Sequence, residues 1–311
     1  MATARDRFIE SLVVYRHASQ QGALLGASPS ATLTDHSARV LRNGLAVIGL
    51  VILEEFIRTR VAELATYVGR ASLPMTSFPA DLRKAATERA VRNLASEVQN
   101  LVRAKQDPTP LIVATAQALS TARSSRVKLA ELSLMWAGSN VRMDDIAAIL
   151  AALGVDKPWV QLTSVAQRSG FRIAAMETTF GTLLTDRHEA AHKMSKEVIN
   201  LDIRSYPNSA LAFAIAFDAV ASRAAAITIS GSLAPPSKRE VTAADVRLRF
   251  VDDTGAGYAE HVEGSSARIA LNTRMRVARA AAVRAAAVAD ETVVVRDRNL
   301  LPTWWRAGNL A

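Results

Sequence analysis

The chain has 311 residues, enough for one large domain or two ordinary ones, and its net charge of +9 favours polyanionic partners such as nucleic acid. It contains no cysteine, which excludes disulfides, thiolate metal sites and cysteine nucleophiles. Half of the residues are hydrophobic but only 5% are aromatic, a composition that favours packed helices over a β-sandwich.

Helical patterns dominate the chain up to about residue 232. After a short helix and a Gly/Ser/Pro/Ala loop at 22–31, a long helix is expected at about 37–68, because apolar residues recur there at three- and four-residue steps. Thr34-Asp35-His36-Ser37 offers side chains that cap a helix N-terminus. The longest apolar stretch, 44–53, is about half of the roughly 20 residues that span a membrane, so we expect a soluble, cytoplasmic protein with no membrane partner.

Prolines and glycines divide the following stretch into shorter helices. Asn140 or Asp144 is expected to begin one of them, and Gly154 to end it. Ser205-Tyr206-Pro207-Asn208 is expected to separate the last two helices. The predicted helices cover about 80–105, 110–122, 126–136, 144–153, 159–169, 172–195 and 209–229.

The composition changes after Ser230, where Pro235-Pro236-Ser237 is typical of a linker. Beyond it, alternating residues predict strands, and an alanine- and arginine-rich stretch predicts one more helix. The predicted elements are strands at 246–251, 257–262 and 292–295 and a helix at 267–289. We therefore expect a mainly α protein with a helical domain, 1–232, and a small α+β appendage, 238–311.

The strongest chemical signal is the hexapeptide Arg187-His188-Glu189-Ala190-Ala191-His192, on the helix predicted at 172–195. It contains the H-E-x-x-H pattern of zinc hydrolases. Positions four apart share one face of a helix, so His188 and His192 would bind zinc while Glu189 acts as the general base.

The surroundings of this pattern argue against zinc. Asp186 and Lys193 are charged where zinc hydrolases of this type have uncharged residues, and Val198 stands where one class of them has a third ligand. Another class of zinc hydrolases takes its third ligand from an acidic residue on a helix further along the chain. Asp202 and Asp218 are available for that role, although neither stands in a recognisable setting. A zinc-dependent hydrolase therefore stays an alternative.

The same hexapeptide places His192 five residues after Arg187, and this spacing resembles the R-x4-6-H motif of HEPN ribonucleases (higher eukaryotes and prokaryotes nucleotide-binding). The string around it is similar to the LvxxRNxiAHg signature of RiboL-PSP-type HEPN domains. Leu184, Arg187, Ala191 and His192 match that signature, while His188 replaces the usual Asn and Lys193 replaces the usual Gly.

The resemblance extends over roughly 37–230 and covers nothing after 235. The long early helix resembles the family's first helix, in which an acidic residue precedes an aromatic one, and Glu54, Glu55 and Phe56 occupy that place. Residues 140–156 look like a family segment that begins with Asn and ends in a Leu-Gly turn.

The resemblance implies a HEPN-like helical bundle and a metal-independent endoribonuclease that needs no cofactor. Cleavage by the RNA 2′-OH needs a group that exchanges protons near neutral pH, and His192 is the candidate. Arg187 is the candidate phosphate clamp, because its guanidinium offers a planar fork of donors. The supporting candidates are His188, Glu54, Glu55 and Glu189.

Residues five apart on an ideal helix point about 140° apart, so one copy does not easily aim Arg187 and His192 at one phosphate. Members of the family join two copies of the motif across a dimer, which implies a homodimer with a composite site. The resemblance also implies an RNA substrate and an antiphage-defence or toxin–antitoxin effector with a cognate antitoxin or defence-system partner. A non-catalytic HEPN-like scaffold that binds nucleic acid or a partner protein is the alternative from another class.

Basic and aromatic residues elsewhere are weaker candidates. RNA contacts are expected from Lys193, Arg274, Arg276 and Arg279, although a solvated helix face explains the three arginines as well. Trp304 and Trp305 either stack on bases or pack in the core. His261 is expected to be exposed in the predicted hairpin.

Overall fold

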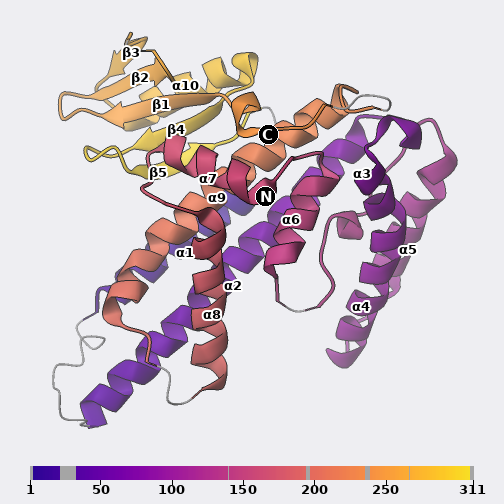
Figure 1. Ribbon diagram of the computed structural model, residues 1–311, viewed down its shortest axis with the longest axis horizontal. Coiled ribbons are helices and arrows are strands. Elements are labelled where there is room, and N and C mark those ends of the chain that lie inside the picture. Colours follow the sequence, from indigo (N-terminus) through magenta and orange to yellow (C-terminus); the bar gives the residue numbers. More distant parts are fainter. Residues whose placement is uncertain are drawn as a thin grey trace.

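The computed structural model describes residues 3–21, 33–138, 140–193, 197–234, 239–265 and 267–308. Two long helices, α2 (Leu33–Arg70) and α9 (Asn200–Ile229), pack against each other at the centre of a helical bundle (Figure 1). The bundle and a small C-terminal sheet confirm the predicted fold class. The shorter helices packed on this pair are α1 (Ala4–Ser19), α7 (Pro158–Ser169) and α8 (Met176–His192), with α6 (Met143–Ala152) beside them.

Helix α2 confirms the long helix predicted at 37–68 and begins earlier. Its buried residues recur at the expected three- and four-residue steps, as Leu50, Leu53 and Ile57 illustrate. The predicted N-cap at 34–37 is wrong, because these residues already lie inside the helix. The loop predicted at 22–31 lies outside the described residues.

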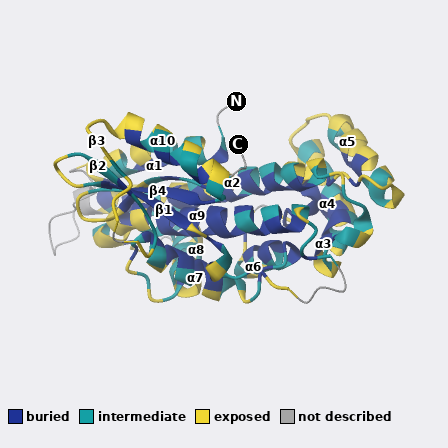
Figure 2. Cartoon of the chain, turned by 90° about the horizontal axis from the view of Figure 1, so that it is seen from above, coloured by how far each residue is buried: buried dark blue, intermediate teal, exposed yellow. Residues whose placement is uncertain are grey.

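Helix α9 corrects one prediction. The break expected at 205–208 is absent, because Pro207 lies inside a continuous helix. Proline removes one helical hydrogen bond, and the burial of Tyr206, Pro207 and the apolar residues after them offsets that loss. Among the described residues α9 is also the one helix long and apolar enough to cross a membrane, but 89% of its most apolar window is buried inside the protein. Figure 2 shows it beside α2 as a core helix, which is consistent with a soluble protein.

A second group of helices follows α2. A continuous helical run confirms the helix predicted at 80–105, and α6, α7 and α8 confirm three more. Gly154, at a φ of 83°, ends α6 as predicted. The run consists of α3 (Ala80–Lys84), a π-helical segment (Ala85–Arg89) and α4 (Ala90–Arg103), and it leads to α5 (Thr109–Ser120). Short 3-10 turns occur at Met75–Ser77, Thr121–Arg123, Glu131–Ser133 and Ala243–Asp245.

The helix predicted at 126–136 is wrong, because this segment forms only the turn Glu131–Ser133. Its apolar residues are buried without helical periodicity. The side-chain amide of Asn93 donates hydrogen bonds to the carbonyls of Leu132 and Met135 at 2.9 and 2.7 Å. A side chain from α4 therefore satisfies backbone groups that a helix would otherwise satisfy internally.

The C-terminal unit is a five-stranded sheet in the order β3-β2-β1-β4-β5. The predicted hairpin is confirmed, because β1 and β2 pair antiparallel, and β1 pairs parallel with β4. The helix predicted at 267–289 is shorter than expected, since its first residues form β3, and β5 was not predicted. The elements are β1 (Leu248–Asp253), β2 (Tyr258–Val262), β3 (Ala270–Asn272), α10 (Met275–Ala289), β4 (Thr292–Arg296) and β5 (Pro302–Arg306).

The sheet is not peripheral to the bundle. One face, with Val251 and Val293, packs on α10, and the other, with Phe250 and Trp305, joins the core of the helices. The predicted linker at 235–237 lies outside the described residues. The two predicted units therefore share one hydrophobic core.

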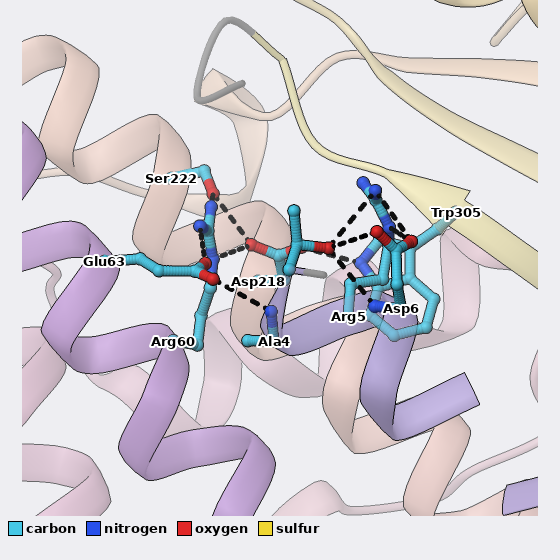
Figure 3. A network of polar contacts seen from close by, with 9 residues as sticks. Ala4, Arg5, Asp6, Arg60, Glu63, Asp218, Ser222 and Trp305 are labelled. Carbon is cyan, nitrogen blue, oxygen red and sulfur yellow. Dashed lines mark hydrogen bonds and ion pairs between the residues drawn. The ribbon is translucent and has the colours of Figure 1, made fainter. Parts of the chain in front are cut away.

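A buried polar network reinforces this contact (Figure 3). The indole Nε1 of Trp305 donates to Oδ2 of Asp218 at 2.8 Å, and Arg60 Nε donates to Oδ1 of the same carboxylate at 2.6 Å. Arg60 also binds Glu63, which accepts the backbone N–H of Ala4 at 2.8 Å. The network ties β5 to α9, α2 and α1.

Candidate active site

The guanidinium of Arg187 is held where three segments distant in sequence converge. Its Nη2 donates a hydrogen bond to Oδ1 of Asn140, in the loop before α6, at 3.0 Å. The next residue, Val141, donates its backbone N–H to Oε1 of Glu54 on α2 at 2.9 Å. Arg187 and the Glu54 carboxylate attract each other electrostatically. Helix α8, helix α2 and the loop thus fix one arginine.

A pocket of about 320 Å³ opens beside this arginine, between α8, α2 and the start of α6. The Nε of Arg187 is buried and has no hydrogen-bond partner among the described residues. The guanidinium itself lines the pocket, so it offers a positive charge to a ligand bound there. The pocket is lined by Leu50, Asn140, Val141, Arg142, Met143, Asp144, Leu184, Arg187 and His188.

The two histidines of the motif lie one turn apart on the outer side of α8. The centroids of their rings are 4.8 Å apart, and both side chains are exposed. His188 lines the pocket, whereas His192, the last residue of the helix, does not. Arg187 therefore points inward while His192 lies outside, in line with the separation of about 140° expected on one helix.

Comparison with protein families matches residues 28–222 to RiboL-PSP-HEPN, over well more than half of the 311 residues. The chain belongs to the RiboL-PSP-HEPN family. The match runs from just before α2 into α9 and stops before the sheet. It supports a nuclease-like or nucleotide-binding role in general. Searches of curated proteins and of solved structures return no match.

In this HEPN domain only one of the two predicted acidic residues of α2 faces the motif. Glu54 is 8% exposed, and burial raises the pKa of its carboxyl group. The Val141 amide, Arg187 and Arg58 each lower that pKa and so partly offset the effect of burial. Glu55 is exposed, accepts a hydrogen bond from Thr59 at 3.2 Å and does not line the pocket. The structure therefore favours Glu54 as the supporting residue.

Glu54→Gln is expected to stabilise the fold progressively as the pH rises above 4.5, the ordinary pKa of a glutamate carboxyl group. The folded-state pKa of Glu54 is raised, so its contribution to stability is full at low pH and falls as the carboxyl group ionises. Glutamine removes that loss and still accepts the Val141 N–H. Thermal unfolding at several pH values checks this, with Glu55→Gln as the matched control on the same helix turn. A pH-independent difference between Glu54→Gln and wild type would contradict it.

Asn140 is the contact that the sequence reasoning missed. Neither Asn140 nor Asp144 caps α6, because the helix begins at Met143 and its cap is Arg142, whose N–H donates to the Asp145 carboxylate at 2.8 Å. Asn140 instead holds Arg187. The available signal was its place at the start of the segment that resembles the HEPN family.

The positions of the proposed zinc ligands give little support to a zinc-dependent hydrolase. His188 and His192 share a face, but Glu189 forms an ion pair with Lys193 at 2.7 Å. Asp218 is buried and engaged by Arg60 and Trp305 (Figure 3). Across the part of the chain that the structure describes, no group of three or more His, Cys, Asp or Glu residues is placed to hold a metal ion.

The predicted RNA-binding arginines do not belong to this pocket. Arg274 and Arg276 are exposed at the start of α10, at the top of Figure 1, whereas α8 ends near the bottom. The guanidinium of Arg279 lies 4.6 Å from the centroid of the Trp304 ring. A role for these arginines and for Lys193 in RNA binding stays a prediction.

Two aromatic side chains of the C-terminal unit, Trp305 and His261, are buried or partly buried in the protein. Trp305 is fully buried, as one of the two alternatives predicted. The expectation of an exposed His261 is wrong, because its ring is partly buried and lies 5.3 Å from the ring of Phe250. The His261 side chain also lies beside Asp252 and Arg296, which cover part of it.

Proposed function

We propose that this HEPN protein is a metal-independent endoribonuclease that cleaves RNA through Arg187 of one copy and His192 of a second copy. The observation that carries the proposal is the guanidinium of Arg187, which Asn140 holds through Nη2 and which lines a pocket. The two adjacent imidazoles of His188 and His192 lie at the outer side of the same helix.

The chemistry needs no metal. The RNA 2′-OH attacks the adjacent phosphorus, the bond from phosphorus to the 5′-oxygen breaks, and the products are a 2′,3′-cyclic phosphate and a 5′-OH. A histidine takes the proton from the 2′-OH or gives one to the leaving oxygen, and His192 suits this role because it is exposed. Arg187 stabilises the charge that develops on the phosphate oxygens. His188 orients the neighbouring imidazole of His192.

A second copy is proposed because Arg187 and His192 face different ways in one chain. The N-terminal half of α2, next to the pocket, supports this arrangement. Leu41, Ile48 and Val51 on this helix are 48%, 53% and 49% exposed, at steps of seven and three residues. An exposed apolar stripe of this kind is typical of an interface, and a closed twofold dimer uses the same surface on both copies.

Membership of the HEPN family supports a proposal for the biological setting. We infer a cytoplasmic effector of antiphage defence or of a toxin–antitoxin pair, whose activity a cognate antitoxin or defence-system partner controls. The basic chain, with a net charge of +9, supports a polyanionic substrate such as RNA.

One assay tests the function. Total RNA is incubated with wild type, His192→Ala and the control His17→Ala, an exposed histidine on α1, with and without EDTA. Cleavage is expected to survive EDTA, to leave cyclic phosphate ends, and to fall about 10²–10⁴-fold in His192→Ala only. Loss of activity in EDTA would favour the zinc hydrolase, and no cleavage in any condition would favour the non-catalytic scaffold.

A further inference from the structure

We propose that the pocket beside Arg187 binds the guanine base of an unpaired RNA nucleotide, with the phosphate of that nucleotide at Arg187. The inference rests on the proposed function and gives it a substrate preference. Three features of the pocket support it: its apolar walls, the carboxylate of Asp144 and the guanidinium of Arg187.

The walls and the size of the pocket suit one base. Leu50 from α2, Met143 from α6 and Leu184 from α8 supply apolar side chains from three sides. Its volume of about 320 Å³ lies at the low end of small-ligand pockets, which span roughly 300–1,000 Å³. Bases taken out of a stack are held in this way, between apolar side chains and a few polar groups that read their edges.

Asp144 supplies the group that distinguishes bases. It lines the pocket, is exposed, and has no hydrogen-bond or ion-pair partner within the described part of the chain. An ionised carboxylate only accepts hydrogen bonds and receives two parallel donors well. Guanine offers two adjacent donors, N1–H and the 2-amino group, on its Watson–Crick edge. Adenine and cytosine offer one donor beside a ring nitrogen that accepts and would repel the carboxylate.

Arg187 fixes the other end of the nucleotide. Its Nη2 is engaged by Asn140, and its buried Nε lacks a partner among the described residues. The guanidinium of Arg187 lines the pocket, and a phosphate there supplies the negative charge that suits it. Arg142, which also lines the pocket, offsets the repulsion between Asp144 and the phosphate. Because a paired guanine hides its Watson–Crick edge, the proposal requires single-stranded RNA.

Asp144 could instead serve only to stabilise α6. It is the second residue of that helix, where a negative charge interacts favourably with the helix dipole. Asp81 is the second residue of α3, is also exposed, and does not line the pocket. Asp81→Asn is therefore a matched control for Asp144→Asn. Both remove one charge at the same helix position, so similar unfolding temperatures are expected for the two variants.

Calorimetric titration with mononucleotides tests the proposal without cleavage. The probes are guanosine, inosine and adenosine monophosphates, each as the 3′- and the 5′-phosphate, and the proteins are wild type, Asp144→Asn and Asp81→Asn. Inosine lacks only the 2-amino group. We expect the guanosine form to bind wild type and Asp81→Asn at least about tenfold more tightly than the other two, and Asp144→Asn to lose that preference.

The outcomes separate this inference from the proposed function. Equal binding of the three bases, no binding of any, or an unchanged preference in Asp144→Asn would overturn the guanine pocket even if the protein cleaves RNA. A guanine preference that Asp144→Asn abolishes, in a protein that cleaves no RNA, would support the pocket and contradict the ribonuclease.

Discussion

A fragment that ends at residue 232 is expected not to fold, and the full chain is expected to unfold in one transition. The reason is the shared core: Phe250, Val294 and Trp305 of the sheet lie in the same hydrophobic cluster as the helices. Trp305→Ala alone is expected to cost about 3–5 kcal/mol, a large part of a total stability of about 5–15 kcal/mol. Removing the whole sheet exposes far more of the core than this single substitution does.

Substitutions at the two tryptophans separate packing from hydrogen bonding. Trp305→Phe keeps a ring but leaves Asp218 without the indole donor, and is expected to cost about 1–3 kcal/mol. Trp304→Ala is the control, because Trp304 is only partly buried, between Arg5 and Arg279, and its loss should cost less. Urea unfolding followed by circular dichroism measures all three variants. A cooperatively folded 1–232 fragment, or two separate transitions in the full chain, would contradict the shared core.

Periodicity in the sequence predicts the helices whose burial is one-sided, and α2 and α8 are of that kind. It fails where burial is nearly complete. In α9 the apolar residues continue on almost every side, so Pro207 looked like a boundary, whereas tertiary packing keeps the helix intact. In the segment 126–136 the spacing of the apolar residues predicts a helix that does not form. The side chain of Asn93 donates hydrogen bonds to two backbone carbonyls of this segment, which keeps it in a non-helical conformation.

The chemical motif was found from sequence because Arg187, His188 and His192 lie within six consecutive positions. Asn140 and Glu54 could not be connected with Arg187 in this way, since they lie 47 positions away for Asn140 and still farther for Glu54. Only the fold brings α2, α8 and the loop before α6 together. The same holds for the pairing of Trp305 with Asp218, which no local pattern predicts.

A composite site predicts that a dimer of two different inactive variants regains RNA cleavage. Arg187→Ala and His192→Ala should each be almost inactive alone, because every site lacks one essential group. In a dimer that contains one copy of each variant, one composite site lacks both groups and the other keeps both. The intact site pairs Arg187 from the His192→Ala copy with His192 from the Arg187→Ala copy.

The most direct test is therefore the RNA cleavage rate of that mixed dimer, co-expressed with two different tags and purified through both. About half of the rate of a doubly tagged wild-type dimer is expected, while both single-variant dimers stay near background. A mixed dimer as inactive as the single variants, or a wild-type protein that cleaves RNA as a monomer, would contradict a site built from Arg187 and His192 of two copies.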